Sequence, residues 1–329
     1  MKDWQAFISG QAQDLAEQNF ICDADELGLI LVGGEDAREF LQNQLSNDID
    51  LIDENNFQMS SYSTPKGRML AIFRVIQISN GYLLLTPKSL VLPVIQRLQS
   101  YVVRSRVTLA DACDYFARFA IQTDNKKISA HSWLADHPGG CFQNDVVVTL
   151  QLTPLAGQAR FLLLCLDLTE ARRLWTEFAE ILQVSGYSAW RLAEIKAGIP
   201  VIYSQTSEQF VLQMSNLNLL GGVSFKKGCF PGQEIVARMQ YLGTLKRRMF
   251  LAKIETDQLP QPGDELVAQG KNEIDGSGKV VDATFDGNGY CYLLYIAQIA
   301  KAEQGQLYLF KQPERDIQNL ELPYLPVSA

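Results

Sequence analysis

The sequence lacks closely paired cysteines. Its 329 residues contain six cysteines, and no two of them form a Cys-x-x-Cys pair. Disulfide-stabilised secreted domains have denser cysteines, and structural zinc sites use close pairs. The two histidines, His131 and His137, are spaced in a way that suits no usual metal motif, and we expect both to face solvent. The pattern predicts a reducing compartment and no metal site.

The sequence also lacks a long apolar run. Stretches such as residues 161–166 are far shorter than the roughly 20 residues that cross a bilayer. Residues 1–20 mix charged and amide side chains with apolar ones, so they lack the apolar centre of a signal peptide. We therefore expect a cytoplasmic protein that has no membrane partner.

A surplus of basic residues is absent as well. Lys and Arg number 29 against 37 Asp and Glu, which gives a formal net charge of -8. Strong direct binding to nucleic acid normally requires a basic surplus, so we do not expect it here. One basic run, Lys246-Arg247-Arg248, has two open interpretations. It could contact a tRNA or the glutamate tail of a folate, or it could simply begin a strand.

Hydrophobic residues make up 47% of the chain, which is enough for a substantial core. Strand patterns alternate with helical spacing in the first 200 residues, and Asn80-Gly81 predicts a hairpin turn between two of the strands. This order is typical of an α+β fold. The expected strands are residues 27–32, 69–78, 82–86, 145–152 and 160–166, and the expected helices begin near residues 35, 90, 169 and 190.

The pattern of apolar and turn residues changes after Arg248. Short apolar stretches at residues 249–254, 279–285, 290–296 and 306–310 are separated by Pro-Gly, Asp-Gly and Asn-Gly pairs. Such spacing is typical of a small antiparallel barrel or sandwich. We therefore predict a region 1–245 that holds two α/β subdomains, followed by a C-terminal antiparallel β-barrel at residues 246–329.

One segment combines unusual residue choices that point to chemistry. It reads Lys226-Lys227-Gly228-Cys229-Phe230-Pro231-Gly232-Gln233-Glu234, with Arg238 four residues further on. The glycines permit unusual backbone angles or close approach of a ligand. Pro231-Gly232 marks a turn, and a helix can begin at Gln233 with Glu234 in its first turn. A lysine pair and a helix N-terminus both favour a thiolate, so Cys229 is a candidate functional thiol. The other five cysteines lie in apolar or loop contexts, and we expect them to be structural.

This segment resembles the signature of the YgfZ family of folate-binding proteins linked to tRNA modification. The resemblance extends over residues 190–243, including Ala197-Gly198-Ile199-Pro200 and Gly221-Gly222-Val223-Ser224-Phe225, and is general in pattern elsewhere. The motif residues that carry it are Lys226, Lys227, Gly228, Cys229, Gly232, Gln233, Glu234 and Arg238. The resemblance implies a relation to the glycine-cleavage T-protein, an aminomethyltransferase. It therefore implies α/β subdomains around a central channel that can hold tetrahydrofolate or a derivative.

The chain departs from the transferase at its catalytic carboxylates. The transferase carries an Asp pair, and the comparable positions here are Ala71 and Ile72. Neither side chain can accept a proton, so the chain lacks the carboxylate on which the transferase chemistry depends. The sequence therefore favours a protein that is not a conventional enzyme.

The resemblance also suggests folate contacts. Trp190 matches a tryptophan that could stack on a pterin or aminobenzoyl ring, although an aromatic anchor to the core is an equal alternative. A second family aromatic is replaced by Leu27, which leaves an apolar wall. Lys226 and Lys227 are further candidates for folate binding.

The pterin-binding glutamate of the transferase is replaced by Lys196. Either another carboxylate, such as Glu194 or Glu208, accepts the pterin hydrogen bonds, or the ligand binds differently.

Three functions remain open at this stage. The first is a folate-binding accessory protein that supports iron–sulfur enzymes, including radical tRNA-modifying enzymes as clients, with wider regulation such as replication initiation implied by resemblance. The second is a folate-dependent one-carbon transferase or demethylase with a relocated catalytic group. The third is a thiol redox sensor that uses Cys229 without folate.

Overall fold

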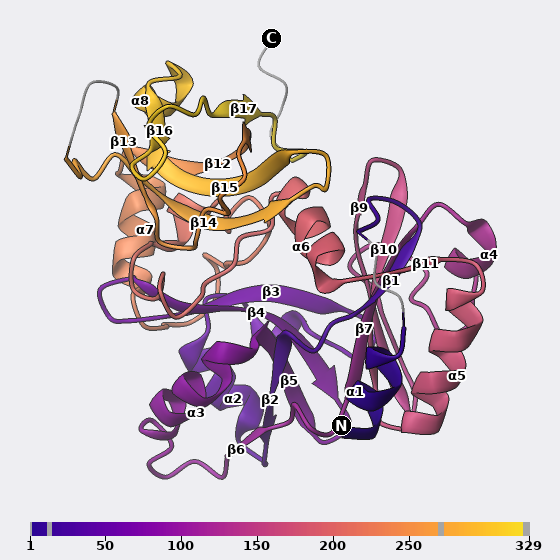
Figure 1. Cartoon of the computed structure of the whole chain (residues 1–329). Helices are drawn as coiled ribbons and strands as arrows, with labels where there is room; N and C mark the ends of the chain where they lie inside the picture. Colours follow the sequence, from indigo (N-terminus) through magenta and orange to yellow (C-terminus); the bar gives the residue numbers. More distant parts are fainter. Residues whose placement is uncertain (1, 12–14, 269–272, 325–329) are drawn as a thin grey trace. The chain divides into compact units, whose positions relative to one another are not determined.

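Three β-sheets organise the residues that this computed structural model describes, which are 2–11, 15–268 and 273–324 (Figure 1). The chain divides into two units. Unit 1 comprises Met1–Leu41, Asp48–Gln58 and Phe73–Trp190, and unit 2 comprises Gln42–Asn47, Met59–Ile72 and Arg191–Ala329. The predicted boundary at residue 245 stays a prediction.

The first sheet lies entirely in unit 1 and has the strand order β11-β1-β7-β10-β9-β8. Its neighbouring strands are antiparallel, except that β1 and β11 are parallel. The strands are β1 (Phe20–Asp23), β7 (Ala117–Thr123), β8 (Cys141–Gln143), β9 (Val147–Leu155), β10 (Gln158–Cys165) and β11 (Gln183–Ser185). Strands β9 and β10 confirm the prediction for residues 145–152 and 160–166.

Helix α5 (Leu168–Ala179) packs on this sheet and matches the helix expected from residue 169. It begins at Asp167, whose carboxylate accepts hydrogen bonds from the backbone N–H groups of Thr169 and Glu170. Its apolar side chains recur at helical spacing, and Trp175 meets Trp4 of α1 (Lys2–Ser9) edge to face, with ring centroids 5.6 Å apart. The core of unit 1 therefore forms between a helix face and a sheet face.

The second sheet has the order β3-β4-β5-β2-β6, and strands β3 and β4 carry residues of both units. The β4–β5 hairpin confirms the predicted turn, because Ile78 pairs with Gly81 across Ser79-Asn80. A side chain at Gly81 would lie 2.2 Å from the Val32 carbonyl oxygen, so only glycine fits there. The strands are β2 (Leu27–Gly33), β3 (Phe57–Ser63), β4 (Met69–Ile78), β5 (Gly81–Pro87) and β6 (Thr108–Asp111).

The third sheet lies in unit 2 and has the order β16-β13-β14-β15-β12-β17, antiparallel throughout. It confirms the predicted C-terminal antiparallel structure, and its buried side chains form a separate core. The strands are β12 (Arg247–Glu255), β13 (Glu265–Ala268), β14 (Gly278–Phe285), β15 (Tyr290–Gln298), β16 (Leu307–Leu309) and β17 (Gln318–Leu320).

The remaining helices lie between strands along the chain. Predicted helices near residues 35, 90 and 190 are confirmed as α2, α3 and α6. The helices are α2 (Ala37–Gln44), α3 (Val91–Gln99), α4 (Lys126–Ser129), α6 (Tyr187–Lys196), α7 (Gln233–Tyr241) and α8 (Ile299–Glu303), and the 3-10 helices are η1 (Ile49–Leu51), η2 (Lys88–Leu90) and η3 (Leu212–Ser215).

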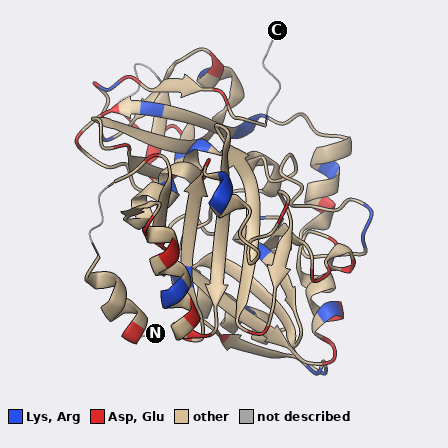
Figure 2. Cartoon of the chain, turned by 90° about the vertical axis from the view of Figure 1, so that its right-hand side faces the viewer, with Lys and Arg blue, Asp and Glu red and all other residues tan. Residues whose placement is uncertain are grey.

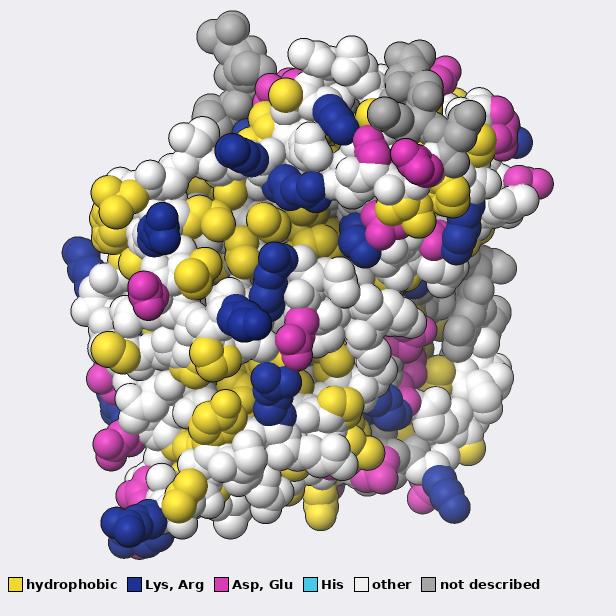
Figure 3. Space-filling view, turned by 90° about the vertical axis from the view of Figure 1, so that its left-hand side faces the viewer, with side chains coloured by type: hydrophobic (Ala, Val, Ile, Leu, Met, Phe, Trp, Pro, Cys, Tyr) yellow, Lys and Arg dark blue, Asp and Glu magenta, His cyan; other side chains and the backbone are white. Residues whose placement is uncertain are grey.

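Charged residues are sparse on the long strands in the centre of Figure 2 and denser on the helices and turns. This fits the nearly continuous burial of β7 and β10. On the side drawn in Figure 3, Lys and Arg side chains stand among apolar side chains. Within the described residues, every helix is too short or too polar to span a lipid bilayer.

Candidate functional site

The candidate site in unit 2 is the segment Lys226–Gly232, named the Cys229 loop below. It leads directly into α7, which begins at Gln233 as predicted. Gly232 has a φ of +84°, and the Phe230 carbonyl accepts a hydrogen bond from the Gln233 N–H at 3.1 Å. The left-handed glycine therefore turns the chain from the loop into the helix.

Lys227 connects this loop to residues 42–47 of unit 2. Its Nζ donates to the carbonyl oxygens of Gln42 at 2.6 Å, Leu45 at 2.8 Å and Asn47 at 2.7 Å. Carbonyls at the C-terminal end of a helix such as α2 lack helical partners and carry partial negative charge. An ammonium has three N–H donors, so these three acceptors match its capacity.

Lys227 is only 9% exposed. Its ammonium is thus a buried cation whose charge is compensated by carbonyl dipoles. A contact of this ammonium with folate stays a prediction, and it would have to compete with the three carbonyls.

Residues 42–47 also hold the part of the chain just before the Cys229 loop. Ser46 Oγ donates to the Gly222 carbonyl at 2.7 Å, and the Ser46 carbonyl accepts from the Ser224 N–H at 3.1 Å. Asn47 Nδ2 donates to the Gly221 carbonyl at 2.7 Å. Residues far apart in sequence therefore fix both the approach to the loop and the loop itself.

Gly232 has a second role, because its backbone touches the β3–β4 turn at Gly67. A Cβ atom on Gly232 would lie 2.6 Å from Gly67 Cα and 2.8 Å from the Thr64 carbonyl oxygen. Both neighbours are backbone atoms that cannot rotate away. Gly67 itself has a φ of +70° and faces Ile235 of α7. The glycine at 232 is therefore required twice, by its φ and by this contact.

Phe230 completes the attachment. Its side chain is buried, and Lys227 Nζ lies 5.7 Å from the centroid of its ring. We call Lys227, Phe230 and Gly232 the anchor residues. Between and beside them, Lys226, Gly228 and Cys229 are exposed, and we call these three the exposed residues.

The six thiols divide in the same way. Cys229 is exposed, and Cys22, Cys113, Cys141, Cys165 and Cys291 are all buried. Burial raises the pKa of the thiols of Cys141, Cys165 and Cys291 to about 12. These three stay protonated and unreactive near neutral pH. Cys229 is the thiol within reach of a partner.

The remaining motif residues lie on α7. Gln233 Nε2 donates to the Gly228 carbonyl at 3.5 Å, and Glu234 and Arg238 are exposed. Glu234 occupies the first turn, where a negative charge is favourable. Gln213 Nε2 donates to the Val236 carbonyl at 2.7 Å and so ties the helix to η3.

The predicted folate contacts Trp190 and Leu27 belong to unit 1. The Trp190 side chain is fully buried, and the Arg160 guanidinium carbon lies 4.8 Å from its ring centroid. The Trp190 Nε1 donor has no hydrogen-bond partner in the described part of the chain. Leu27 begins β2 and is 8% exposed. Folate contact by either residue stays a prediction.

The positions that replace transferase carboxylates are apolar. Ala71 and Ile72 are both buried in β4. Lys196, which stands where the transferase has a glutamate, places its ammonium 4.4 Å from the ring centroid of Tyr292 in the third sheet. The ammonium thus has an aromatic neighbour within unit 2. Replacement of the missing acceptor by Glu194 or Glu208 stays a prediction.

No group of three or more metal-ligating side chains occurs among the described residues. His137 is exposed, as expected. The prediction for His131 was wrong, because its ring packs 5.2 Å from the Phe178 ring and its Nε2 lies 3.5 Å from a Glu177 carboxylate oxygen. The sequence could not show that α5 would cover this histidine.

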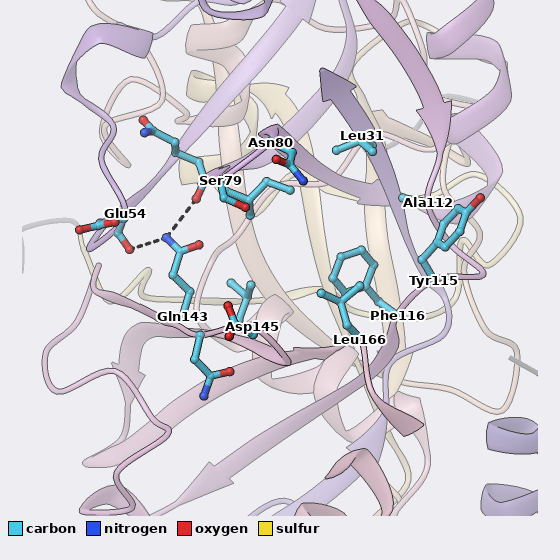
Figure 4. Close-up of a pocket in the computed structure, with 14 residues that line it drawn as sticks. Leu31, Glu54, Ser79, Asn80, Ala112, Tyr115, Phe116, Gln143, Asp145 and Leu166 are labelled. Atoms are coloured by element: carbon cyan, nitrogen blue, oxygen red, sulfur yellow. Dashed lines mark hydrogen bonds between the residues drawn. The ribbon is translucent and has the colours of Figure 1, made fainter. Parts of the chain in front are cut away.

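Sequence reasoning missed a cavity of about 620 Å³ in unit 1 (Figure 4). Phe116 and Leu166 lie on one side of it, and Gln143 and Asp145 lie on the other. Gln143 Nε2 donates to the carbonyls of Glu54 and Gln77 at 2.8 and 3.2 Å, which fixes that wall. None of the predicted site residues lines this cavity.

Curated proteins named tRNA-modifying protein YgfZ resemble this chain along most of its length. The protein from Colwellia psychrerythraea is 29% identical over 330 residues, covering 97% of this chain and 98% of its own. Its counterpart from Photobacterium profundum is 29% identical over 95% of this chain and 94% of its own. The Yersinia enterocolitica protein is 28% identical over 91% of each chain. No protein-family model matches the chain.

Among solved structures, the glycine cleavage system aminomethyltransferase T from Bartonella henselae superposes with a TM-score of 0.72 at 15% identity. The match covers 93% of this chain and 86% of that one. At this identity the likeness concerns the fold alone, and it confirms the predicted aminomethyltransferase-like α+β fold. The resemblance first read from the Cys229 loop is also confirmed, because the chain is similar to proteins named tRNA-modifying protein YgfZ over most of its length.

Proposed function

We propose that this chain is a folate-binding accessory protein that supports iron–sulfur enzymes and thereby tRNA modification, with the Cys229 thiol as its working group. The observation that carries the proposal is the structure of the Cys229 loop. The anchor residues are buried on either side of Cys229, and the thiol of Cys229 is exposed between them. A structural cysteine would have no need of such an arrangement, because it would be buried like the other five.

The accessory role is favoured over one-carbon transfer by the positions of Ala71 and Ile72. Both side chains are apolar and buried, so neither can supply the carboxylate of the related transferase. A chain with the transferase fold but without its carboxylates is expected to retain ligand binding more readily than turnover. Fold alone does not determine function, and the site must decide between them.

Folate binding rests on the predicted resemblance and on the chemistry of the candidate contacts. Lys226 is exposed, and its ammonium suits the carboxylates of a folate glutamate. Lys227 contributes through position, because its ammonium already contacts three carbonyls. Trp190 is the predicted indole contact and Leu27 the predicted apolar contact for a pterin or aminobenzoyl ring. Because the Trp190 side chain is fully buried, a ligand ring would stack on it only after the side chains that cover it move.

The main test is complementation. A bacterial strain that lacks its own YgfZ protein would be supplied with this chain or with its Cys229→Ala variant, and thiolated nucleosides in tRNA would be measured by mass spectrometry. We expect the wild-type chain to restore thiolation and Cys229→Ala to lose that activity. Cys229→Ser tests whether sulfur itself is needed, and Cys141→Ala is the matched control at a buried thiol.

Full rescue by Cys229→Ala would overturn the role of this thiol. Circular dichroism and urea unfolding of both alanine variants would show that the fold is retained. A loss of rescue in Cys229→Ala together with an intact fold separates function from stability.

Folate binding is tested separately by calorimetry with tetrahydrofolate. The chain has four tryptophans, so fluorescence quenching is compared between the wild-type chain and Trp190→Phe. Quenching that disappears in the variant would support a site at Trp190. Binding without turnover of any reduced folate supports the accessory role, and turnover of 5,10-methylene- or 5-formyl-tetrahydrofolate would favour a transferase or demethylase instead. An absence of binding would leave a Cys229 redox sensor.

A further inference from the structure

A second cavity lies wholly within unit 2, and none of its lining residues belongs to the Cys229 loop. Its volume is about 290 Å³, near the lower limit of small-molecule sites. Part of its wall is apolar, from Phe210, Met214 and Ile296. The charged residues Arg68, Arg247, Lys279 and Glu265 also line it.

These charges do not cancel. Lys279 Nζ lies 2.6 Å from Glu265 Oε1, and the two residues are register partners across β13 and β14. That pair is neutral as a unit. The guanidinium groups of Arg68 and Arg247 remain, and among the described residues neither forms an ion pair with a carboxylate. The cavity therefore has a surplus of two positive charges in a chain whose net charge is -8.

Other arginines of this molecule show what a carboxylate partner would look like. Where the structure describes them, many arginines have one. Ion pairs with Asp or Glu are formed by Arg38, Arg106, Arg118, Arg173, Arg191, Arg248 and Arg315. Arg68 and Arg247 have no such partner among the described residues, and both line one small cavity, so a ligand with a negative group would find two cations there.

Both guanidinium groups are held in place by a carbonyl. One terminal nitrogen of Arg68 donates to the Gln209 carbonyl at 2.7 Å, and one of Arg247 donates to the Gly276 carbonyl. The backbone around Arg68 is also fixed, because it bridges to Val211 and the Met69 N–H donates to the Phe210 carbonyl at 2.8 Å. A guanidinium has five N–H donors, so each arginine keeps donors for a ligand.

Glu265 adds a polar acceptor to the same wall. Its Oε2 atom is buried and accepts no hydrogen bond within the described part of the chain. A buried carboxylate oxygen without a donor is costly. A ligand that carries an N–H or O–H beside its negative group would supply that donor.

We propose that this cavity binds an oxyanion, a phosphate group or a carboxylate, through Arg68 and Arg247. The planar guanidinium fork matches both groups in a bidentate way. Arg247 belongs to the basic run 246–248, for which contact with a tRNA or a folate glutamate tail is one open interpretation. The site uses none of the residues on which the function proposed above depends, so the proposal does not rest on that function.

The test is calorimetric titration of the whole chain at low salt with inorganic phosphate and, separately, with glutarate. We expect saturable binding of at least one of them. Binding of phosphate alone assigns a phosphate source, and binding of glutarate alone assigns a carboxylate source. If both bind, competition between them shows that they share one site.

Three variants locate the site. Arg68→Gln and Arg247→Gln should each weaken binding about tenfold or more, as expected for loss of a charge-assisted hydrogen bond. The matched control is Arg104→Gln, an exposed arginine of unit 1 that should bind like the wild-type chain. Absence of binding of both anions at millimolar concentration, or unchanged binding in both cavity variants, would overturn the proposal. Urea unfolding of each variant separates loss of binding from loss of fold.

Discussion

The anchor residues and the exposed residues of the Cys229 loop are neighbours in sequence, yet the structure treats them in opposite ways. Lys227 is buried against three carbonyls, whereas Lys226 is exposed. Gly232 has no room for a Cβ, whereas a Cβ on Gly228 would meet nothing within 4 Å. Residue type alone therefore does not reveal a role. The surroundings of each lysine and each glycine decide whether it serves the fold or stays available to a partner.

The thiols provide the largest expected contrast. In the native chain we expect an aromatic disulfide reagent to modify one of the six thiols quickly, and the other five at least about a thousandfold more slowly, because they require opening of the structure. The reaction is followed by absorbance, with urea-unfolded protein as the reference for all six. Removal of the fast phase in Cys229→Ala identifies the reacting thiol. Two or more fast thiols would contradict the burial of the others.

The two glycines come next. Gly232→Ala forces a side chain onto a left-handed residue and against the backbone of Gly67, so we expect the free energy of unfolding to fall by about 3 kcal/mol. Gly228→Ala is the matched control, with an expected change within about 0.5 kcal/mol. Urea unfolding measures both. Equal effects would show that the contact with Gly67 does not fix the loop.

The two lysine variants should differ in unfolding free energy by somewhat less than the two glycine variants. Lys227→Met leaves the carbonyls of Gln42, Leu45 and Asn47 without their donor, which we expect to cost about 2 kcal/mol of stability. Lys226→Met at the exposed neighbour should change stability by less than about 0.5 kcal/mol. If both variants unfold at the same urea concentration, the ammonium of Lys227 does not hold the loop.

The last effect concerns pH and is the smallest when it is counted per pH unit. Burial raises the pKa of the Cys165 thiol from its ordinary 9.0 to about 12. Between these values the unfolded chain has lost this proton and the folded chain still holds it. The stability is therefore complete below pH 9 and falls by about 1.4 kcal/mol per pH unit above it, for this thiol.

Cys165→Ala should flatten the dependence of unfolding free energy on pH above 9 by that amount. Leu163→Ala, a buried change on the same strand, should lower stability without altering the slope. An unchanged slope in Cys165→Ala would mean that its thiol titrates alike in both states.

Local patterns predicted much of the fold. Ser79-Asn80-Gly81 placed the β4–β5 turn, and the helical pattern expected from residue 169 placed α5. Strands β13 and β17 were missed, because segments of four and three residues carry too little alternation to recognise. The turn at Pro231-Gly232 and the start of α7 were predicted correctly, since both depend on neighbouring residues.

The sequence could not predict which side chains meet across long separations. Lys227 contacts carbonyls that lie 180 to 185 residues earlier in the chain, and a backbone carbonyl leaves no signature in the sequence. The pairing of Arg68 with Arg247 on one cavity is of the same kind. Such contacts follow from the folded topology, so the role of a lysine or arginine could be assigned only after the fold was known.

The clamp formed by Lys227 has a consequence for any molecule that reacts with or binds to Cys229. Ordering a flexible loop on binding reduces affinity, because conformational freedom is lost at that moment. Here the loop is ordered during folding, through the three carbonyl contacts and the Gly67–Gly232 contact. A partner therefore meets a preorganised sulfur, and its binding energy need not be spent on fixing the segment that carries it.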